Sequence, residues 1–226
     1  LIKRNKTIGS ITSFAGIIIL AGGLILNLRP TNTGTLISFG ALIVGFIVAQ
    51  VSTYFVSRFG RSPRYDEVIA SNLEKLSNNY TFYVYSAPVP LLLVGPEGLW
   101  IPIPISAGGE IYFDKKWKQR GGSLLLKFFG QENIGRPQLD VQSYEKTMTE
   151  FLTENLNLET LPPIKSILVL IHPKGIIGDV ANAPTPLVEP DALRRKIRLM
   201  DRKTDKQIEP DLSENINQAL LDYKKG

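Results

Sequence analysis

Two uncharged stretches near the N-terminus decide the fold of this chain: Thr7–Leu28 reads TIGSITSFAGIIILAGGLILNL, and Pro30–Ser57 reads PTNTGTLISFGALIVGFIVAQVSTYFVS. A helix needs about 20 predominantly apolar residues, each rising about 1.5 Å, to cross a hydrocarbon core about 30 Å thick. Both stretches are long enough, and only Arg29 and a polar turn separate them. They predict a transmembrane hairpin over residues 1–61, with spans at about 8–28 and 35–57.

The first stretch is open to two other interpretations. Lys3, Arg4 and Lys6 resemble the basic start of a signal peptide, but the apolar run is longer than such peptides use, and a second run follows at once. A pair of core helices in a soluble protein is the other interpretation. Soluble helices of this length normally carry charges, so the hairpin is the favoured prediction.

Basic residues flank the predicted hairpin on one side. Three precede the first span and three follow the second, whereas the connecting turn has only Arg29. Because Lys and Arg beside spans stay in the cytoplasm, we expect a multi-pass protein of the bacterial cell (inner) membrane with both termini cytoplasmic. The absence of cysteine agrees with a cytoplasmic domain. The six flanking residues are Lys3, Arg4, Lys6, Arg58, Arg61 and Arg64.

The basic character of the chain belongs to this anchor. Among 226 residues there are 26 Lys and Arg and 21 Asp and Glu, a net charge of +5. Seven of the 26, the six above and Arg29, lie beside the spans, so 19 basic residues face all 21 acidic ones from Tyr65 onward, a net charge of −2. Strong positive charge marks most nucleic-acid-binding domains, so nucleic acid is not an expected partner.

Small residues recur every four positions in the second span, at Ala41, Gly45 and Ala49. Such a face lets another helix approach closely, either the first span or a helix of another membrane subunit. Gln50 is a lone polar residue near the inner end, and neither span contains a charged residue or histidine. An ion path, a proton path or a haem ligand within the hairpin is therefore not expected.

The remainder of the chain, 62–226, predicts an α+β cytoplasmic domain with the order helix, antiparallel strand meander, helix, strand, helix. Ser62 and Pro63 fit the start of its first helix. Pro102 and Pro104 would restrict their strand to an edge or an irregular position. Leu139 is expected on the buried face of the long helix, with Tyr144, Met148, Phe151 and Leu152. The expected strands are 81–85, 91–94, 99–105, 110–114, 123–129 and 167–171, and the expected helices are 62–76, 137–155, 191–200 and one starting at 209–210.

One part of this domain carries a family resemblance. Leu92–Ile101 reads LLVGPEGLWI, and Gly109-Glu110-Ile111 follows a strand and turn later. This glycine frame resembles the nuclease-related domain (NERD) family, a branch of the PD-(D/E)xK nuclease fold, over roughly residues 65–200. The later strand 164–170, after a long helix, is also similar to that family. The resemblance implies a restriction-endonuclease-like fold.

The same resemblance implies that the catalytic residues are missing. In register, the metal-binding aspartate of the family falls on Pro90, its glutamate on Ile103 and its lysine on Ile105. Two carboxylates must hold the divalent cation, and the lysine stabilises charge near the attacking water. Proline and isoleucine do none of this, so the resemblance implies a pseudo-nuclease without catalytic residues, metal or cofactor.

Other candidate sites are weaker. His172 is the only histidine and follows an apolar strand, which is more typical of a structural residue than of a catalyst. Gly108-Gly109 and Gly121-Gly122 fit turns, because no Gly-Lys-Ser or Gly-Lys-Thr follows either pair.

The domain contains two clusters of basic residues, and each is either a solvated face or a contact for anionic lipid or an acidic partner. The first is expected on a loop and the second on a helix and its exit. The first contains Lys115, Lys116, Trp117, Lys118 and Arg120, and the second contains Arg194, Arg195, Lys196, Arg198, Arg202 and Lys203.

These patterns together favour a non-enzymatic accessory or structural subunit of a larger membrane protein complex, respiratory, photosynthetic or secretory. Its partners would be other membrane subunits and the lipid bilayer, with the nuclease-like domain as a cytoplasmic docking surface. Two alternatives stay open. One is a membrane-tethered nucleic-acid-binding protein or nuclease, and the other is an anionic-lipid surface sensor acting through Lys115–Arg120.

Overall fold

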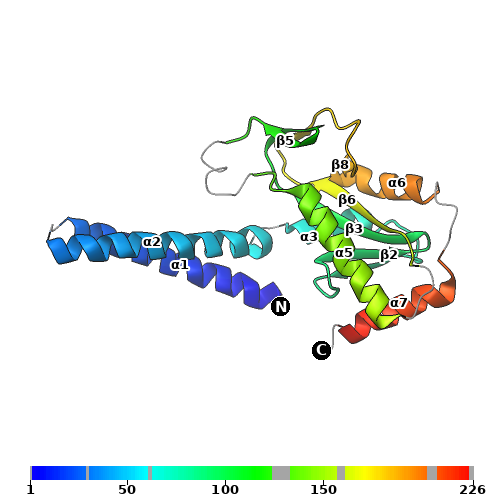
Figure 1. Cartoon of the computed structure of the whole chain (residues 1–226), viewed down its shortest axis with the longest axis horizontal. Helices are drawn as coiled ribbons and strands as arrows, with labels where there is room; N and C mark the ends of the chain where they lie inside the picture. The colour runs from blue at the N-terminus through cyan, green and yellow to red at the C-terminus, as the bar shows by residue number, and fades with distance from the viewer. Residues whose placement is uncertain are drawn as a thin grey trace. The chain divides into compact units, whose positions relative to one another are not determined.

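The two uncharged stretches form long helices that pack side by side (Figure 1). A computed structural model describes residues 2–28, 31–60, 63–123, 133–156, 161–202 and 208–223. The chain divides between Arg64 and Tyr65 into two compact units, the helical hairpin and a mixed α/β domain.

The first hairpin helix begins before its uncharged stretch, whereas the second lies within its own. They contain candidate membrane spans of 24 and 23 residues, long and apolar enough to cross a bilayer, which indicates a membrane association. The Thr31 hydroxyl accepts the backbone N–H of Gly34 at 3.0 Å and caps the second helix. The elements are α1, Ile2–Asn27, α2, Asn32–Phe55, and a short π-helix, Val56–Gly60.

The domain is built on a five-stranded mixed sheet with the order β1-β2-β3-β6-β8. The first three strands form the expected antiparallel meander, and β6 then joins β3 in parallel, as does β8 with β6. A parallel partner requires a crossover, and the long helix α5 provides it between β3 and β6 (Figure 1). The bounds are β1 Thr81–Val84, β2 Leu91–Gly95, β3 Gly98–Ile105, α5 Pro137–Asn155, β6 Ile164–Leu170 and β8 Leu187–Val188.

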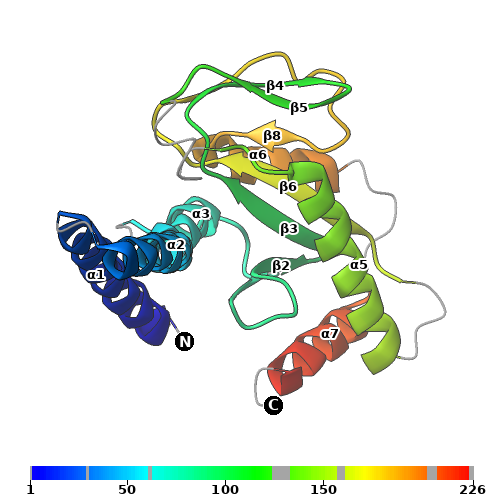
Figure 2. The same ribbon diagram turned by 60° about the vertical axis from the view of Figure 1, so that its left-hand side comes forward.

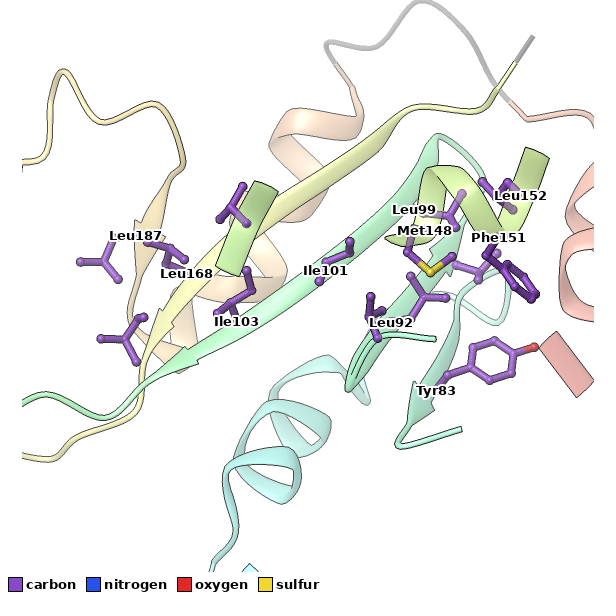
Figure 3. Packing of buried hydrophobic residues seen from close by; sticks show 14 of the residues in the cluster. Tyr83, Leu92, Leu99, Ile101, Ile103, Met148, Phe151, Leu152, Leu168 and Leu187 are labelled. Atoms are coloured by element: carbon purple, nitrogen blue, oxygen red, sulfur yellow. The ribbon is translucent and has the colours of Figure 1, made fainter. Parts of the chain in front are cut away.

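Helices cover both faces of this sheet. On one face Met148, Phe151 and Leu152 of α5 pack against strand residues such as Leu92 and Ile101 (Figure 3). Apolar residues of α7, Pro210–Tyr223, join the same core. Trp100 belongs to the core on the other face, beneath α3, Tyr65–Leu73, and α6, Pro190–Asp201. Side chains that alternate along β3 thus supply two separate cores.

A second sheet has the order β5-β4-β7 and lies apart from the first (Figure 2). We expected a loop over residues 115–120, but Trp117 is buried there and the segment forms β5, antiparallel to β4. Lys115 occupies the tip of this hairpin with a φ of 57°, and residues 124–129, expected as a strand, lie outside the described residues. The bounds are β4 Gly109–Asp114, β5 Lys116–Arg120 and β7 Gly175–Ile177.

Pro102 and Pro104 lie in the middle strand of the large sheet, so the expected edge position is wrong. The register explains how β3 accommodates them. Leu99 donates its N–H to Pro163 at 2.8 Å, so the odd-numbered residues of β3 bond with the β6 side and the even-numbered ones face β2. Pairing with β2 ends at Trp100. The two prolines, which have no N–H, therefore face a side where the ladder has already ended.

The helices differ from expectation in detail. α3 begins at Tyr65, not at Pro63, and Ser62 lies outside the described residues. Leu139 is 51% exposed, and Val141 takes its place on the buried face of α5. Val141, Met148 and Leu152 are spaced by seven and four residues, which keeps one helix face, whereas Leu139 lies two residues off that series.

Candidate functional site

The three positions that the family resemblance singled out lie in or beside the large sheet. Ile103 and Ile105 lie in β3 opposite Leu168 and Leu170 of β6. Pro90 comes just before β2, whose pairing with β3 ends at Leu93 and Trp100.

The surroundings of the two isoleucines are apolar. Ile103 and Ile105 are each 4% exposed and belong to one core with Ala107, Ile111 and Leu168 (Figure 3 shows Ile103 beside Leu168). Hydrocarbon side chains neither ligate a cation nor exchange a proton. Across the described residues, no group of three or more His, Cys, Asp or Glu side chains is placed to hold a metal ion.

Hydroxyl groups meet at the carboxyl end of β3. The Tyr65 hydroxyl donates to the Ser106 hydroxyl at 2.5 Å and so joins the start of α3 to the end of β3. The two residues are 41 positions apart, and nothing in their local sequence pointed to the contact.

His172 follows β6 and lines an open cavity of about 370 Å³ with Asn72, Glu189 and Asp191. Its Nδ1 accepts the backbone N–H of Lys174 at 3.1 Å. This bond places the imidazole in the turn after the strand and leaves Nε2 as the nitrogen that carries the proton in the neutral ring. A turn-forming role therefore accounts for the position of this histidine.

A buried carboxylate, which the sequence analysis did not identify, is hydrogen-bonded to β3 near the start of that strand. Asp201, 5% exposed, accepts the Trp100 indole N–H at 2.9 Å and the Tyr80 hydroxyl at 2.6 Å. Burial, together with the hydrogen bond to Asp201, raises the pKa of Tyr80. The Lys165 ammonium lies 5.2 Å from the centre of the Trp100 ring. The only local signal was an acidic residue at the end of a helix, where it opposes the helix dipole.

The first basic cluster is largely neutralised within its own hairpin. Lys118 Nζ lies 2.5 Å from Asp114 Oδ2, and this bond raises the pKa of Lys118. Arg120 Nη1 lies 3.5 Å from Glu110 Oε2. Trp117 packs edge-on against Phe113 with ring centres 5.4 Å apart. Only Lys115 and Lys116, at the exposed tip, keep charges that no ion pair within the described part of the chain offsets.

The second basic cluster is arranged differently. Arg195 on α6 and Arg202, the residue directly after this helix, are both exposed, and no ion pair of the residues described in the structure includes them. Arg198 is also exposed and donates to the Lys75 carbonyl oxygen at 2.9 Å, which keeps its charge. Arg194 and Lys196 are half-buried and belong to no ion pair among the described residues, and Lys203 lies outside those residues.

The small residues of α2 pack against α1. A Cβ on Gly45 would lie 2.6 Å from Leu20 Cδ2, and one on Gly23 would lie 2.9 Å from Ala41 Cβ. A Cβ on Gly16 would lie 3.6 Å from the backbone nitrogen of Ala49. The Ala41–Gly45–Ala49 face is thus occupied within the hairpin, while Gln50 is exposed.

Two seven-residue series, missed in the sequence, complete this contact. Gly9, Gly16 and Gly23 recur in α1, and Ser38, Gly45 and Ser52 recur in α2, all of them buried. The Ser38 hydroxyl donates to the Gly23 carbonyl oxygen at 2.7 Å, and the Ser52 hydroxyl donates to that of Gly9 at 3.2 Å. Small residues that recur every seven positions in both helices were the signal that could have identified this face.

Comparison with protein-family models, with curated proteins and with solved structures found no match for this chain.

Proposed function

We propose that this chain is a non-catalytic, membrane-anchored accessory subunit whose nuclease-like domain serves as a docking surface in a larger membrane protein complex. One observation carries the proposal. The positions that correspond to the nuclease aspartate, glutamate and lysine hold Pro90, Ile103 and Ile105, and both isoleucines lie in the apolar core. A domain with a nuclease-like order of elements and apolar side chains at its centre is suited to bind other subunits through its surface.

The order of elements supports a restriction-endonuclease-like fold for the domain. Helix α3, the meander β1-β2-β3, the crossover α5 and the strand β6 follow in the sequence that the family resemblance implied. Fold alone does not define activity, so the chemistry of these positions carries the functional argument.

The hairpin supports the membrane part of the proposal. Its small faces are used between α1 and α2, and its remaining surface is apolar, with Ile17, Ile18, Phe39 and Ile43 exposed. Such a surface fits lipid or the helices of other subunits. The basic flanks favour both termini in the cytoplasm.

Purification from native membranes tests the proposal. The full chain, with an affinity tag at its C-terminus, is extracted in mild detergent, and the proteins that co-migrate at constant ratio through size exclusion are identified. We expect one or more integral membrane proteins at fixed stoichiometry. A monodisperse monomer without a partner would exclude an accessory subunit.

A membrane-tethered nucleic-acid-binding protein or nuclease is the second candidate, because the arginines of α6 suit phosphate groups. The net charge of −2 from Tyr65 onward opposes it. The test is cleavage and binding of single- and double-stranded DNA by the purified full chain with Mg²⁺ or Mn²⁺. Cleavage that EDTA abolishes would replace the first proposal.

A further inference from the structure

Helix α6 exposes a row of arginines on a rigid support. Arg195, Leu199 and Arg202 are spaced by four and three residues, so they follow one another along a single helix face. The opposite face is fixed to the sheet, because Leu193 and Ile197 are fully buried and Asp201 is hydrogen-bonded to β3 and to Tyr80. Packing and hydrogen bonds on the opposite face therefore hold α6 in one orientation, with the arginines directed outward.

The charges on this face are available, in contrast to those of the β4–β5 hairpin. Arg195 and Arg202 take part in no ion pair with any residue that the structure describes. Arg198 donates one N–H to a neutral carbonyl, which orients the guanidinium without neutralising it. Arginine presents several donors in a planar fork, which suits phosphate oxygens.

Leu199 distinguishes between anionic partners. Its side chain is 49% exposed in the midst of the arginines. The phosphate backbone of a nucleic acid, or the carboxylates of an acidic peptide, offer little apolar surface for a leucine that lies among the arginines. The interface of a bilayer accepts both kinds of group, since phosphates pair with arginine and the glycerol and upper acyl region accommodates leucine.

We propose that the exposed face of α6 (Arg195, Arg198, Leu199 and Arg202) docks on the anionic headgroups of the membrane that holds the hairpin. This inference rests on the proposed membrane anchoring. Only residues 61–64 connect the π-helix to α3, so docking is an intramolecular step. Weak attraction then suffices, because a short tether maintains a high effective concentration of the surface.

The experiment uses the full chain in lipid nanodiscs. The chain has no cysteine, so Leu199→Cys gives one labelling position, and an apolar fluorophore there takes the place of the leucine. Phospholipids that carry a spin label on the headgroup quench the fluorophore when α6 is docked. We compare phosphatidylcholine nanodiscs with nanodiscs that also contain phosphatidylglycerol.

We expect strong quenching only with phosphatidylglycerol, and its loss when salt reduces the Debye length to about 3 Å. Each arginine near an anionic surface contributes about a fivefold shift, so R195Q/R202Q lowers the ratio of docked to undocked protein on the order of 25-fold. Arg198 is left intact because it bonds to the Lys75 carbonyl. The charge-conserving R195K/R202K variant retains docking, and the matched variant K115Q/K116Q, on the β4–β5 tip, docks like the unsubstituted chain.

Several results would overturn the inference. Equal quenching in both lipid mixtures, or loss of quenching in K115Q/K116Q alone, excludes docking through α6. Saturable binding of duplex DNA or polyglutamate in phosphatidylcholine nanodiscs, lost in R195Q/R202Q, assigns the face to a soluble polyanion instead, and the same result with inorganic phosphate assigns it to free phosphate. Failure of the chain to co-elute with nanodiscs overturns the anchor as well, whereas co-elution without quenching overturns the docking alone.

Discussion

The Asp201 carboxylate, in the last residue of α6, accepts the indole N–H of Trp100 in β3 at 2.9 Å. The same carboxylate accepts the Tyr80 hydroxyl at 2.6 Å, so one buried charge joins α6, β3 and the segment before β1. Hydrogen bonds to a charged acceptor contribute more than neutral ones, and a buried donor left without a partner is costly. The position of α6 on the sheet, and with it the exposed arginine row, depends on this group.

Replacement of Asp201 should therefore destabilise the domain. Asp201→Ala leaves the buried Trp100 donor and the half-buried Tyr80 donor without an acceptor, and we expect the free energy of unfolding to fall by about 3 kcal/mol. Glu214→Ala, an exposed acidic residue of α7, should change it by less than about 0.5 kcal/mol. Both tryptophans, Trp100 and Trp117, lie in the domain, so their fluorescence during urea unfolding of the full chain in detergent measures this quantity. Equal effects of the two substitutions would contradict a stabilising role for Asp201.

The raised pKa of Tyr80 predicts how stability changes in alkali. Below about pH 10, the ordinary tyrosine value, both the folded and the unfolded protein keep the phenol proton. Above it the unfolded chain loses this proton first, so the free energy of unfolding falls by up to about 1.4 kcal/mol per pH unit for one group. Tyr80→Phe should be less stable at neutral pH, because Asp201 loses a donor, but its stability should decline less steeply above pH 10. Tyr223→Phe is the control for removal of a phenol elsewhere, and parallel alkaline slopes for all three proteins would refute the prediction.

The elements that the sequence predicted well are those with a long, regular pattern. The uncharged spans, the apolar stripe of α5 and the starts of α6 and α7 at Pro190 and Pro210 all follow from local spacing and proline preference. The parallel pairing of β6 with β3 is a contact between residues 65 apart, such as Ile103 and Leu168, and no local pattern encodes it. β5 was missed because Trp117 is its one apolar residue and the other four are charged or polar, which gives a weak strand signal.

The candidate site could be predicted only in part. The predicted strand 99–105 contains Ile103 and Ile105, and the structure places both in β3. The sequence could not predict which basic side chains would be free of ion pairs. Lys118 and Arg120 resemble the arginines of α6 in the sequence, and only the three-dimensional contacts of Asp114 and Glu110 distinguish the two clusters.

Lys115 adopts a φ of 57° at the tip of the β4–β5 hairpin, a backbone conformation that disfavours any side chain with a Cβ. Lys115→Gly should stabilise the domain by about 1 kcal/mol, because glycine reaches this conformation without steric conflict. The neighbouring Lys116 lies in β5, where glycine weakens a strand, so Lys116→Gly should destabilise by about 0.5–1 kcal/mol. Both variants lose one positive charge, so opposite signs in urea unfolding isolate the backbone effect. Destabilisation by both would show that the tip conformation is not strained.

Ser166 carries a buried hydroxyl on β6 that finds no hydrogen-bond partner within the described part of the chain. Ser166→Ala removes this group and should leave stability unchanged or raise it by about 1 kcal/mol. The Ser106 hydroxyl is bonded to Tyr65, so the matched Ser106→Ala should lose about 1 kcal/mol. Urea midpoints of the two variants, compared at equal slope, provide the measurement. A loss for Ser166→Ala as large as for Ser106→Ala would indicate that the Ser166 hydroxyl is bonded in solution.

Gly45 and Gly40 form a matched pair for the packing of the hairpin. A Cβ at Gly45 would lie 2.6 Å from Leu20 Cδ2, whereas a Cβ at Gly40 meets no atom within 4 Å. Gly45→Leu should therefore separate α1 from α2, because the added side chain has no room between them, while Gly40→Leu adds an apolar group to the outer surface and leaves the pair intact. Hydrogen–deuterium exchange of the full chain in detergent micelles measures the outcome. We expect faster exchange in α1 and α2 for Gly45→Leu only. Loss of the co-migrating membrane partner in Gly40→Leu, with normal exchange, would show that the outer face near Gly40 contacts another subunit, whereas increased exchange in Gly40→Leu would contradict the pairing of the two helices through Gly45.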